Sequence, residues 1–231
     1  MKKFELKVLT VAVMLAFTFI CGCSNDNVIS SGGLSNDNMS ISVLSEMDQG
    51  DNSGIIITEA KALIEKVEVE TEPSSESIYL KIEPFVVNLF SLNSVLQTVS
   101  GRIPEGNYSK IKFKIHKPED YQTPPDPEFK TGNSGNQRFS VIIKGTYNGS
   151  NFVYRSRKSV NMVFSLNRPL SIGPTMRNVT IKIDIASWFR NGSDVLDPSN
   201  SSNEDQIDDN IRDSFRSIFI DDDRNGSPDD N

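Results

Sequence analysis

Apolar and polar residues alternate most clearly between Tyr108 and His116. Three large apolar residues share one parity and three lysines share the other: Ile111, Phe113 and Ile115 against Lys110, Lys112 and Lys114. Because successive side chains of a strand point to opposite faces of a sheet, this pattern predicts a strand with one face in the core and a lysine row in solvent. Charged side chains on an outer face also discourage pairing between sheet edges.

A two-residue period recurs from Asn178 to Ile185, where Val179, Ile181, Ile183 and Ile185 are expected to point inward. Further strands are predicted at Ala62–Glu70, Ser77–Ile82, Phe85–Leu89, Val95–Val99, Arg138–Tyr147, Phe152–Lys158 and Ser159–Leu166, the last ending before Pro169. Trp188 and Phe189 are expected to close one end of the core. About seven to nine strands separated by turn residues predict an all-β fold, specifically a β-sandwich.

Two stretches between these strands leave alternatives open. Thr58–Ala62 has the propensity to open a helix capped by Thr58, although a strand is favoured from Ala62 onward. Lys117–Asn136 is a long loop with four prolines, which indicates a semi-rigid, protruding segment. Within it, Tyr121 and Phe129 either contact a partner or pack the loop onto the domain.

The chain begins with the features of a lipoprotein signal peptide, residues 1–22. Lys2 and Lys3 precede an apolar run of 13 residues, Val8–Ile20. A helix of that length spans roughly 20 Å, less than a bilayer core of about 30 Å. Ile20-Cys21-Gly22-Cys23 resembles a lipobox, so Cys23 is predicted to carry a diacylglyceryl group after cleavage at Gly22. The alternative is ordinary secretion with a Cys21–Cys23 disulfide.

The rest of the chain divides by composition. Residues 23–53 are rich in Ser, Asn, Asp and Gly, which predicts a flexible, disordered tether. Residues 54–191 form the predicted β-sandwich domain, and residues 192–231 an acidic C-terminal segment. From Asp194 onward there are 12 acidic residues and 3 arginines, whereas Cys23–Ser193 has 18 of each sign. No basic patch with interleaved aromatic residues appears, so nucleic-acid binding is not expected.

The acidic segment contains a predicted amphipathic helix at about residues 203–219. Ile207, Ile211, Phe215 and Ile218 recur at helical spacing and would form one apolar stripe that docks on the sandwich.

A candidate calcium loop follows this predicted helix. Asp221, Asp223 and Asn225 occupy positions 1, 3 and 5 of an EF-hand-like pattern, with Gly226 at position 6 and Asp229 at position 9. Position 12 falls beyond the sequence, so the bidentate Glu is missing and affinity should be weak. The alternative is an acidic tail that only solubilises the protein.

No catalytic constellation appears in the sequence. There is no glycine-rich phosphate loop and no zinc-ligand spacing, and His116, the single histidine, is expected to be an exposed strand end. Paired carboxylates such as Glu119 and Asp120 leave a hydrolase open as an alternative.

Several segments resemble a bacterial lipoprotein domain family, domain of unknown function 4382. The resemblance covers roughly Ile55–Phe189 and is carried by Ile57–Ala62, Val86–Leu89, Ile103–Tyr108 and Val179–Phe189. It implies a surface lipoprotein with an immunoglobulin- or prealbumin-like β-sandwich and no assigned activity. The family often has Asp where this chain has Asn88.

Together these features predict a lipid-anchored, non-enzymatic protein of the bacterial cell envelope, at the outer membrane, with its domain at the cell surface or in the periplasm. Its β-sandwich would bind an envelope protein or serve assembly. A carbohydrate- or peptide-binding module is the first alternative, with Tyr121, Phe129, Tyr147 and Tyr154 as the aromatic residues to inspect. An envelope hydrolase with two carboxylates in a cleft is the second.

Overall fold

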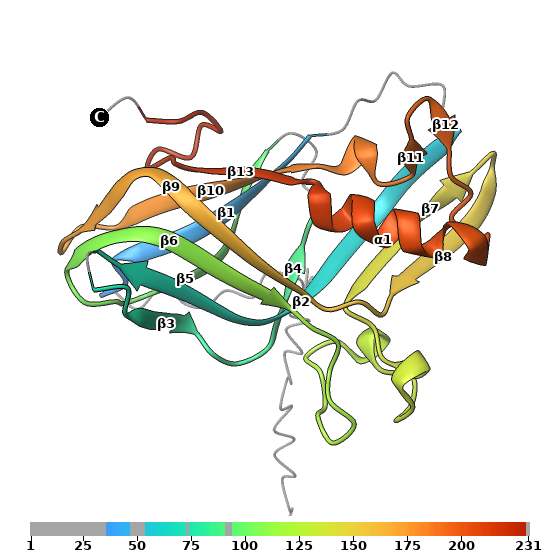
Figure 1. Ribbon diagram of the computed structural model, residues 1–231, viewed down its shortest axis with the longest axis horizontal. Helices are drawn as coiled ribbons and strands as arrows, with labels where there is room; N and C mark the ends of the chain where they lie inside the picture. The colour runs from blue at the N-terminus through green and yellow to red at the C-terminus, as the bar shows by residue number, and fades with distance from the viewer. Residues whose placement is uncertain (1–35, 47–53, 73, 91–93, 230–231) are drawn as a thin grey trace, which may run out of the picture. The chain divides into compact units, whose positions relative to one another are not determined.

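The computed structural model describes residues 36–46, 54–72, 74–90 and 94–229, and these residues form a mostly β structure with two large sheets (Figure 1). The signal peptide, Cys23 and most of the predicted tether lie outside them. One sheet has four strands in the order β13 (Phe215–Ile220), β10 (Arg177–Asp184), β1 (Met39–Glu46) and β5 (Val95–Gly101). The other sheet has seven strands: β2 (Ile55–Thr71), β3 (Ser77–Lys81), β4 (Phe85–Asn88), β6 (Gly106–Ile115), β7 (Val141–Tyr147), β8 (Ser150–Ser156) and β9 (Val160–Ile172).

The 17-residue strand β2 organises the larger sheet. Along one edge it pairs with β7 and then with β6, because Leu63 donates its N–H to Ser140 and accepts the N–H of His116. Along the other edge it pairs with β4 and β3. The Lys117–Asn136 loop therefore leaves the sheet where β6 ends and β7 begins. The helix considered for Thr58–Ala62 is wrong, since these residues are part of β2.

The two sheets share one hydrophobic core, to which β1, β10 and β13 contribute from one side and β2, β6 and β7 from the other. The inward residues predicted for β6 and β10 are confirmed: Ile111, Phe113, Ile115, Val179, Ile181 and Ile183 are all buried. Trp188 and Phe189 are also buried, and the Phe189 ring meets Phe152 edge-on at 5.4 Å. The outward lysines of β6 are paired with glutamates, as in Lys110–Glu70 at 2.7 Å.

The flexible tether predicted for residues 23–53 is wrong for residues 39–46. These residues form β1, which lies between β10 and β5 and places Met39, Ile41 and Val43 in the core. The serines that suggested disorder occupy the opposite face. They are buried and hydrogen-bonded, so their polarity costs little there.

The predicted helix 203–219 is also longer than the helix found. Helix α1 spans Glu204–Asp213, and Phe215–Ile220 is the edge strand β13. Ile207 and Ile211 pack into the core from α1, while Ile218 packs from β13. Phe215 and Ile218 are three residues apart, which is a helical spacing. A β-bulge in the pairing with β10, between Ser217 and Phe215, accommodates this spacing in a strand. The acidic segment therefore belongs to the β domain, and a domain end at residue 191 is wrong.

The remaining elements are short. A small hairpin pairs β11 (Arg190–Asn191) with β12 (Asp194–Val195), and 3-10 helices lie at Pro127–Phe129, Gly135–Gln137, Ile185–Ser187 and Ser201–Asn203. Strand β9 continues through Pro169, contrary to the predicted end at Leu166. The pairing partners jump from Ser165 to Leu170 opposite β6, so the proline sits in a bulge and no ladder hydrogen bond is lost. Among the described residues no helix is long and apolar enough to cross a membrane.

Candidate metal centre and partner-binding loop

The predicted calcium loop folds back onto the four-stranded sheet. Asp221 directly follows β13, and its backbone N–H donates to Asn178 of the neighbouring strand β10. The chain then turns through Arg224 and Gly226, both with positive φ, and returns so that Asp229 donates its N–H to Ile220. Gly226 has a φ of +83°, a conformation that residues with a side chain rarely adopt. A Cβ at this position would also lie only 3.2 Å from Leu44.

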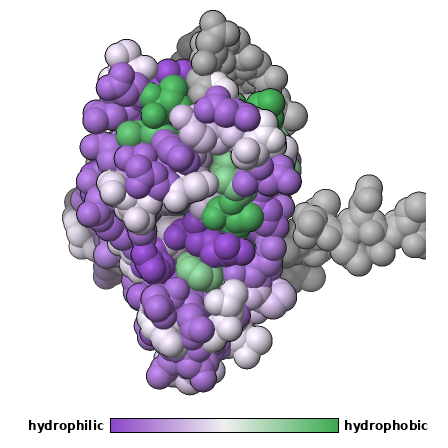
Figure 2. All heavy atoms as spheres, turned by 90° about the vertical axis from the view of Figure 1, so that its right-hand side faces the viewer, coloured by the Kyte–Doolittle hydropathy of each residue, from purple (hydrophilic) through white to green (hydrophobic). Residues whose placement is uncertain are grey.

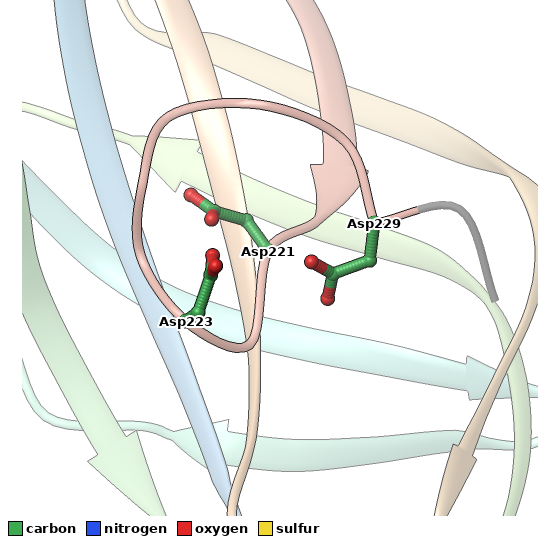
Figure 3. Close-up of side chains that lie close together, drawn as sticks. All are labelled: Asp221, Asp223 and Asp229. Carbon is green, nitrogen blue, oxygen red and sulfur yellow. The ribbon is translucent and has the colours of Figure 1, made fainter.

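Three of the four predicted ligands converge inside this loop (Figure 3). Carboxylate oxygens of Asp221, Asp223 and Asp229 lie within 4.8 Å of one another, with Asp221 buried and Asp223 exposed. The fourth predicted ligand, Asn225, lies in the same turn. Its amide donates to Asp223 at 2.8 Å, and its carbonyl oxygen accepts the N–H of Ser227 at 2.7 Å.

The donor set suits a hard divalent cation. Calcium takes six to eight oxygen ligands, mostly carboxylates and carbonyls, so three carboxylates supply a partial shell that water would complete. Asp222 is not among the converging carboxylates, and its oxygens accept from Arg177 Nε at 2.7 Å and from the Asn178 N–H at 2.8 Å. Weak calcium binding at these three carboxylates stays a prediction.

Asp221 is tied to a buried polar cluster that the sequence did not reveal. Thr180 donates to its Oδ2 at 2.6 Å, and the backbone N–H of Gly226 reaches the same oxygen at 3.2 Å. The Asn178 side chain continues the cluster by accepting from Ser40 at 2.8 Å and Ser42 at 2.9 Å. Ser40 and Ser42 were assigned to the tether, but the Asp221–Asp229 loop lies over them, and Arg224 donates to Ser40 at 3.1 Å. Small polar side chains at alternate positions, as at Ser40 and Ser42, were the sequence feature that could have indicated a second segment packed over this face.

The Lys117–Asn136 loop is held against the larger sheet by an ion cluster. Lys61 Nζ lies 2.5 Å from Asp126 and 2.6 Å from Glu128, and Lys144 Nζ lies 2.7 Å from Glu128. Hydrogen bonds from Lys144 and then Lys61 lower the pKa of Glu128 to about 2. Partial burial of Lys61 acts to lower its pKa. Hydrogen bonds to Asp126 and Glu128 outweigh this effect, so the pKa of Lys61 is raised.

The two aromatic residues of this loop have different environments. Phe129 is fully buried in a small cluster with Leu63, Phe139 and Ile142, so its predicted role is packing. Tyr121 is 81% exposed. Its neighbours are nevertheless fixed, since Lys130 donates to the carbonyls of Asp120 and Gln122. The loop therefore presents one exposed aromatic ring on an ordered support.

The other aromatic candidates do not form a binding strip. Tyr147 is half-buried, and Tyr154 is buried with its hydroxyl donating to Asp208 at 2.7 Å. Burial and this hydrogen bond raise the pKa of Tyr154. Seen from the side that carries the β7–β8 hairpin, the surface is mainly hydrophilic, and hydrophobic residues form small separate groups (Figure 2).

His116 has partners that the sequence did not predict. Its Nδ1 lies 2.5 Å from the Ser159 hydroxyl and its Nε2 lies 3.1 Å from Glu119. Ser, His and Glu are the residue types of a hydrolase triad, but Ser159 is exposed and Arg138 lies 3.6 Å from Glu119. His116 and Arg138 lower the pKa of Glu119. The three residues fix the start of the Lys117–Asn136 loop to the β8–β9 connection. Asp120, the other carboxylate suggested for a hydrolase, does not join this group; its carbonyl accepts from Lys130.

Comparison with known proteins gives one structural likeness. No family model and no curated protein matches the chain, including the lipoprotein family suggested by the sequence. The solved structure of MbnP from Methylosinus trichosporium is similar over 70% of this chain and 80% of that one, at 11% identity and a TM-score of 0.42. A likeness at this level carries no statement about function.

Proposed function

We propose that this chain is a lipid-anchored protein of the bacterial envelope whose β domain binds a protein partner and catalyses no reaction. The anchor is Cys23, and the membrane is the outer membrane or the cell surface. The domain is an immunoglobulin- or prealbumin-like sandwich. The observation that carries the binding role is the ordered presentation of Tyr121 by the Lys117–Asn136 loop.

Exposed aromatic residues on fixed supports are favourable contact points. A tyrosine loses little conformational entropy on binding, and it offers both a ring and a hydroxyl. Here the ion cluster around Lys61 and the buried Phe129 have already fixed the loop backbone. A partner would therefore meet a surface that needs little ordering.

The binding role has a direct test in membrane extracts. The full chain should capture a partner that Tyr121→Ala loses, whereas Tyr79→Ala, which removes a half-exposed tyrosine from β3, should retain it. Equal capture by both variants would argue against the loop. A glycan screen of the same variants tests the carbohydrate-binding alternative, for which the dispersed tyrosines give little support.

The anchor and the lack of catalysis are tested separately. Cys23→Ser should release the protein from membranes or leave it uncleaved, as fractionation and mass would show. Ester hydrolysis by the parent should not exceed that of Ser159→Ala. A clear difference between these two chains would instead favour the hydrolase alternative.

A further inference from the structure

A shallow cleft of about 250 Å³ lies between strand β8 and the segment that leads into helix α1. One wall comes from β8 and the residues that follow it, and includes Val153, Arg155 and Arg157. The other wall comes from residues 198–201 and from Glu204, the first residue of α1. The cleft therefore places two arginines beside a short turn of the chain.

Arg155 is the basic residue of this cleft that has no acidic partner. Its guanidinium carbon lies 5.5 Å from the centroid of the Phe139 ring, which also lines the cleft. Its Nε is buried and has no hydrogen-bond partner among the described residues, and no carboxylate of that part of the chain forms an ion pair with it. Because an arginine stays charged at any ordinary pH, Arg155 brings an unneutralised cation to the cleft.

The other charges beside the cleft neutralise one another. Arg157 forms an ion pair with Glu204, and Lys158 Nζ lies 3.0 Å from Asp205. Asp208 is buried behind this surface, where it accepts from Tyr154. The charge that the cleft can offer to a ligand is therefore that of Arg155, with Arg157 close by.

The walls of the cleft indicate which kind of anion fits. Val153, Phe139 and Pro198 give it an apolar lining beside the guanidinium. A planar guanidinium can donate two parallel N–H···O hydrogen bonds to a carboxylate, and apolar walls favour an anion that carries a carbon chain. We propose that this cleft binds a carboxylate group of a peptide, with its oxygens on Arg155 and its carbon chain against Val153 and Pro198. The site lies outside the Lys117–Asn136 loop and does not depend on the role of Tyr121.

Titration of the full chain, purified in detergent and followed by NMR, measures binding at the cleft itself. The Arg155 Nε–H gives its own resonance, which a ligand on the guanidinium should shift in a saturable manner. Acetyl-glutamate methylamide supplies a side-chain carboxylate and acetyl-phenylalanine a C-terminal one, so the tighter probe identifies the source. Acetyl-glutamine methylamide, which is neutral, should bind at least tenfold more weakly than its acidic counterpart. Low ionic strength is used because salt screens exposed charges.

Variants of the two walls test the assignment of the residues. Arg155→Gln should weaken binding of the carboxylate probes by about tenfold. Arg216→Gln, which removes an exposed arginine paired with Asp184 on β13, should leave binding unchanged. Glu204→Gln should strengthen binding several-fold, because it leaves Arg157 without its carboxylate. The Glu204 carbonyl, which accepts from Tyr154, is retained in that variant.

Several results would overturn the proposal. They are the absence of a shift with either carboxylate probe, equal binding of the glutamine probe, and undiminished binding by Arg155→Gln. Tighter binding of inorganic phosphate than of both carboxylates would also contradict the peptide assignment. If Arg155→Gln does not fold, Glu204→Gln decides: unchanged or weaker binding in that variant means that the anion does not lie between the two arginines.

Discussion

Thr180 donates a hydrogen bond to Asp221, 2.6 Å away, on the face of the four-stranded sheet that points away from the core. Both residues are fully buried. An outward threonine of an amphipathic strand would ordinarily meet water, and an acidic C-terminal residue would ordinarily be solvated. Their contact shows that the Asp221–Asp229 loop is part of the folded domain.

Removing this donor should destabilise the domain. In Thr180→Val the Asp221 carboxylate keeps its backbone donors but loses one hydrogen bond in a buried site, at a cost of about 1–3 kcal/mol in the free energy of unfolding. Urea denaturation measures the loss. Thr123→Val, at an exposed position, is the matched control and should change stability by less than about 0.5 kcal/mol. Equal losses would mean that the Thr180–Asp221 contact is not made in solution.

Calcium should bind weakly to the Asp221–Asp229 loop. Isothermal titration should give a dissociation constant in the millimolar range, and about 10 mM calcium would then stabilise the domain by about 1.4 kcal/mol. The double variant Asp221→Ala, Asp223→Ala should show no binding heat. Asp209→Asn, an exposed-face change on helix α1, should retain it. Absence of heat from the parent protein ends the calcium hypothesis.

Acid should weaken the attachment of the Lys117–Asn136 loop. The pKa of Glu128 is about 2 in the folded protein, below its ordinary 4.5, because of Lys144 and Lys61. A lowered folded pKa gives stability that is present above pH 4.5 and lost as the pH falls toward 2. Glu128 is partly exposed, so solvent screening limits the effect to about 1 kcal/mol.

The variant Glu128→Gln tests this pH dependence. Its melting temperature should fall less steeply than that of the parent between these pH values, and it should match the parent more closely in acid than at neutral pH. Glu83→Gln, whose carboxylate lies 3.7 Å from Lys81 at an exposed site, is the control. A Glu128→Gln profile parallel to that of the parent would contradict the ion-pair assignment.

The N-terminal strand β1 should be essential for folding. Ile41 is fully buried, so Ile41→Ala should cost about 2–5 kcal/mol. Val163→Ala, at a position more than half exposed, should cost much less. A chain that begins at Gly54 lacks β1 and should fail to fold, as judged by circular dichroism. If residues 23–53 were only a tether, the same chain would fold normally. A cooperative unfolding transition in that shortened chain would show that β1 is dispensable.

The sequence by itself determined the strands with a strict two-residue period. In β6 and β10 the alternation is local, and burial of one face against any core gives the same inward set, including Ile111 and Ile181. The spacing of Asp221, Asp223 and Asp229 likewise predicted carboxylates that converge, because a short turn around Gly226 brings them together. Asn225, the fourth predicted ligand, donates its amide to Asp223 within the same turn.

Only the tertiary structure decided the elements whose partners are distant in sequence. Ser40 and Ser42 looked like tether residues until Asn178, more than 130 positions away, supplied their hydrogen bonds. Phe215–Ile220 became a strand because the edge of β10 was free to pair with it. Ser159 met His116 only through the pairing of β6 with β9. In each case a non-local partner, absent from any local pattern, supplied the free energy that fixed the conformation.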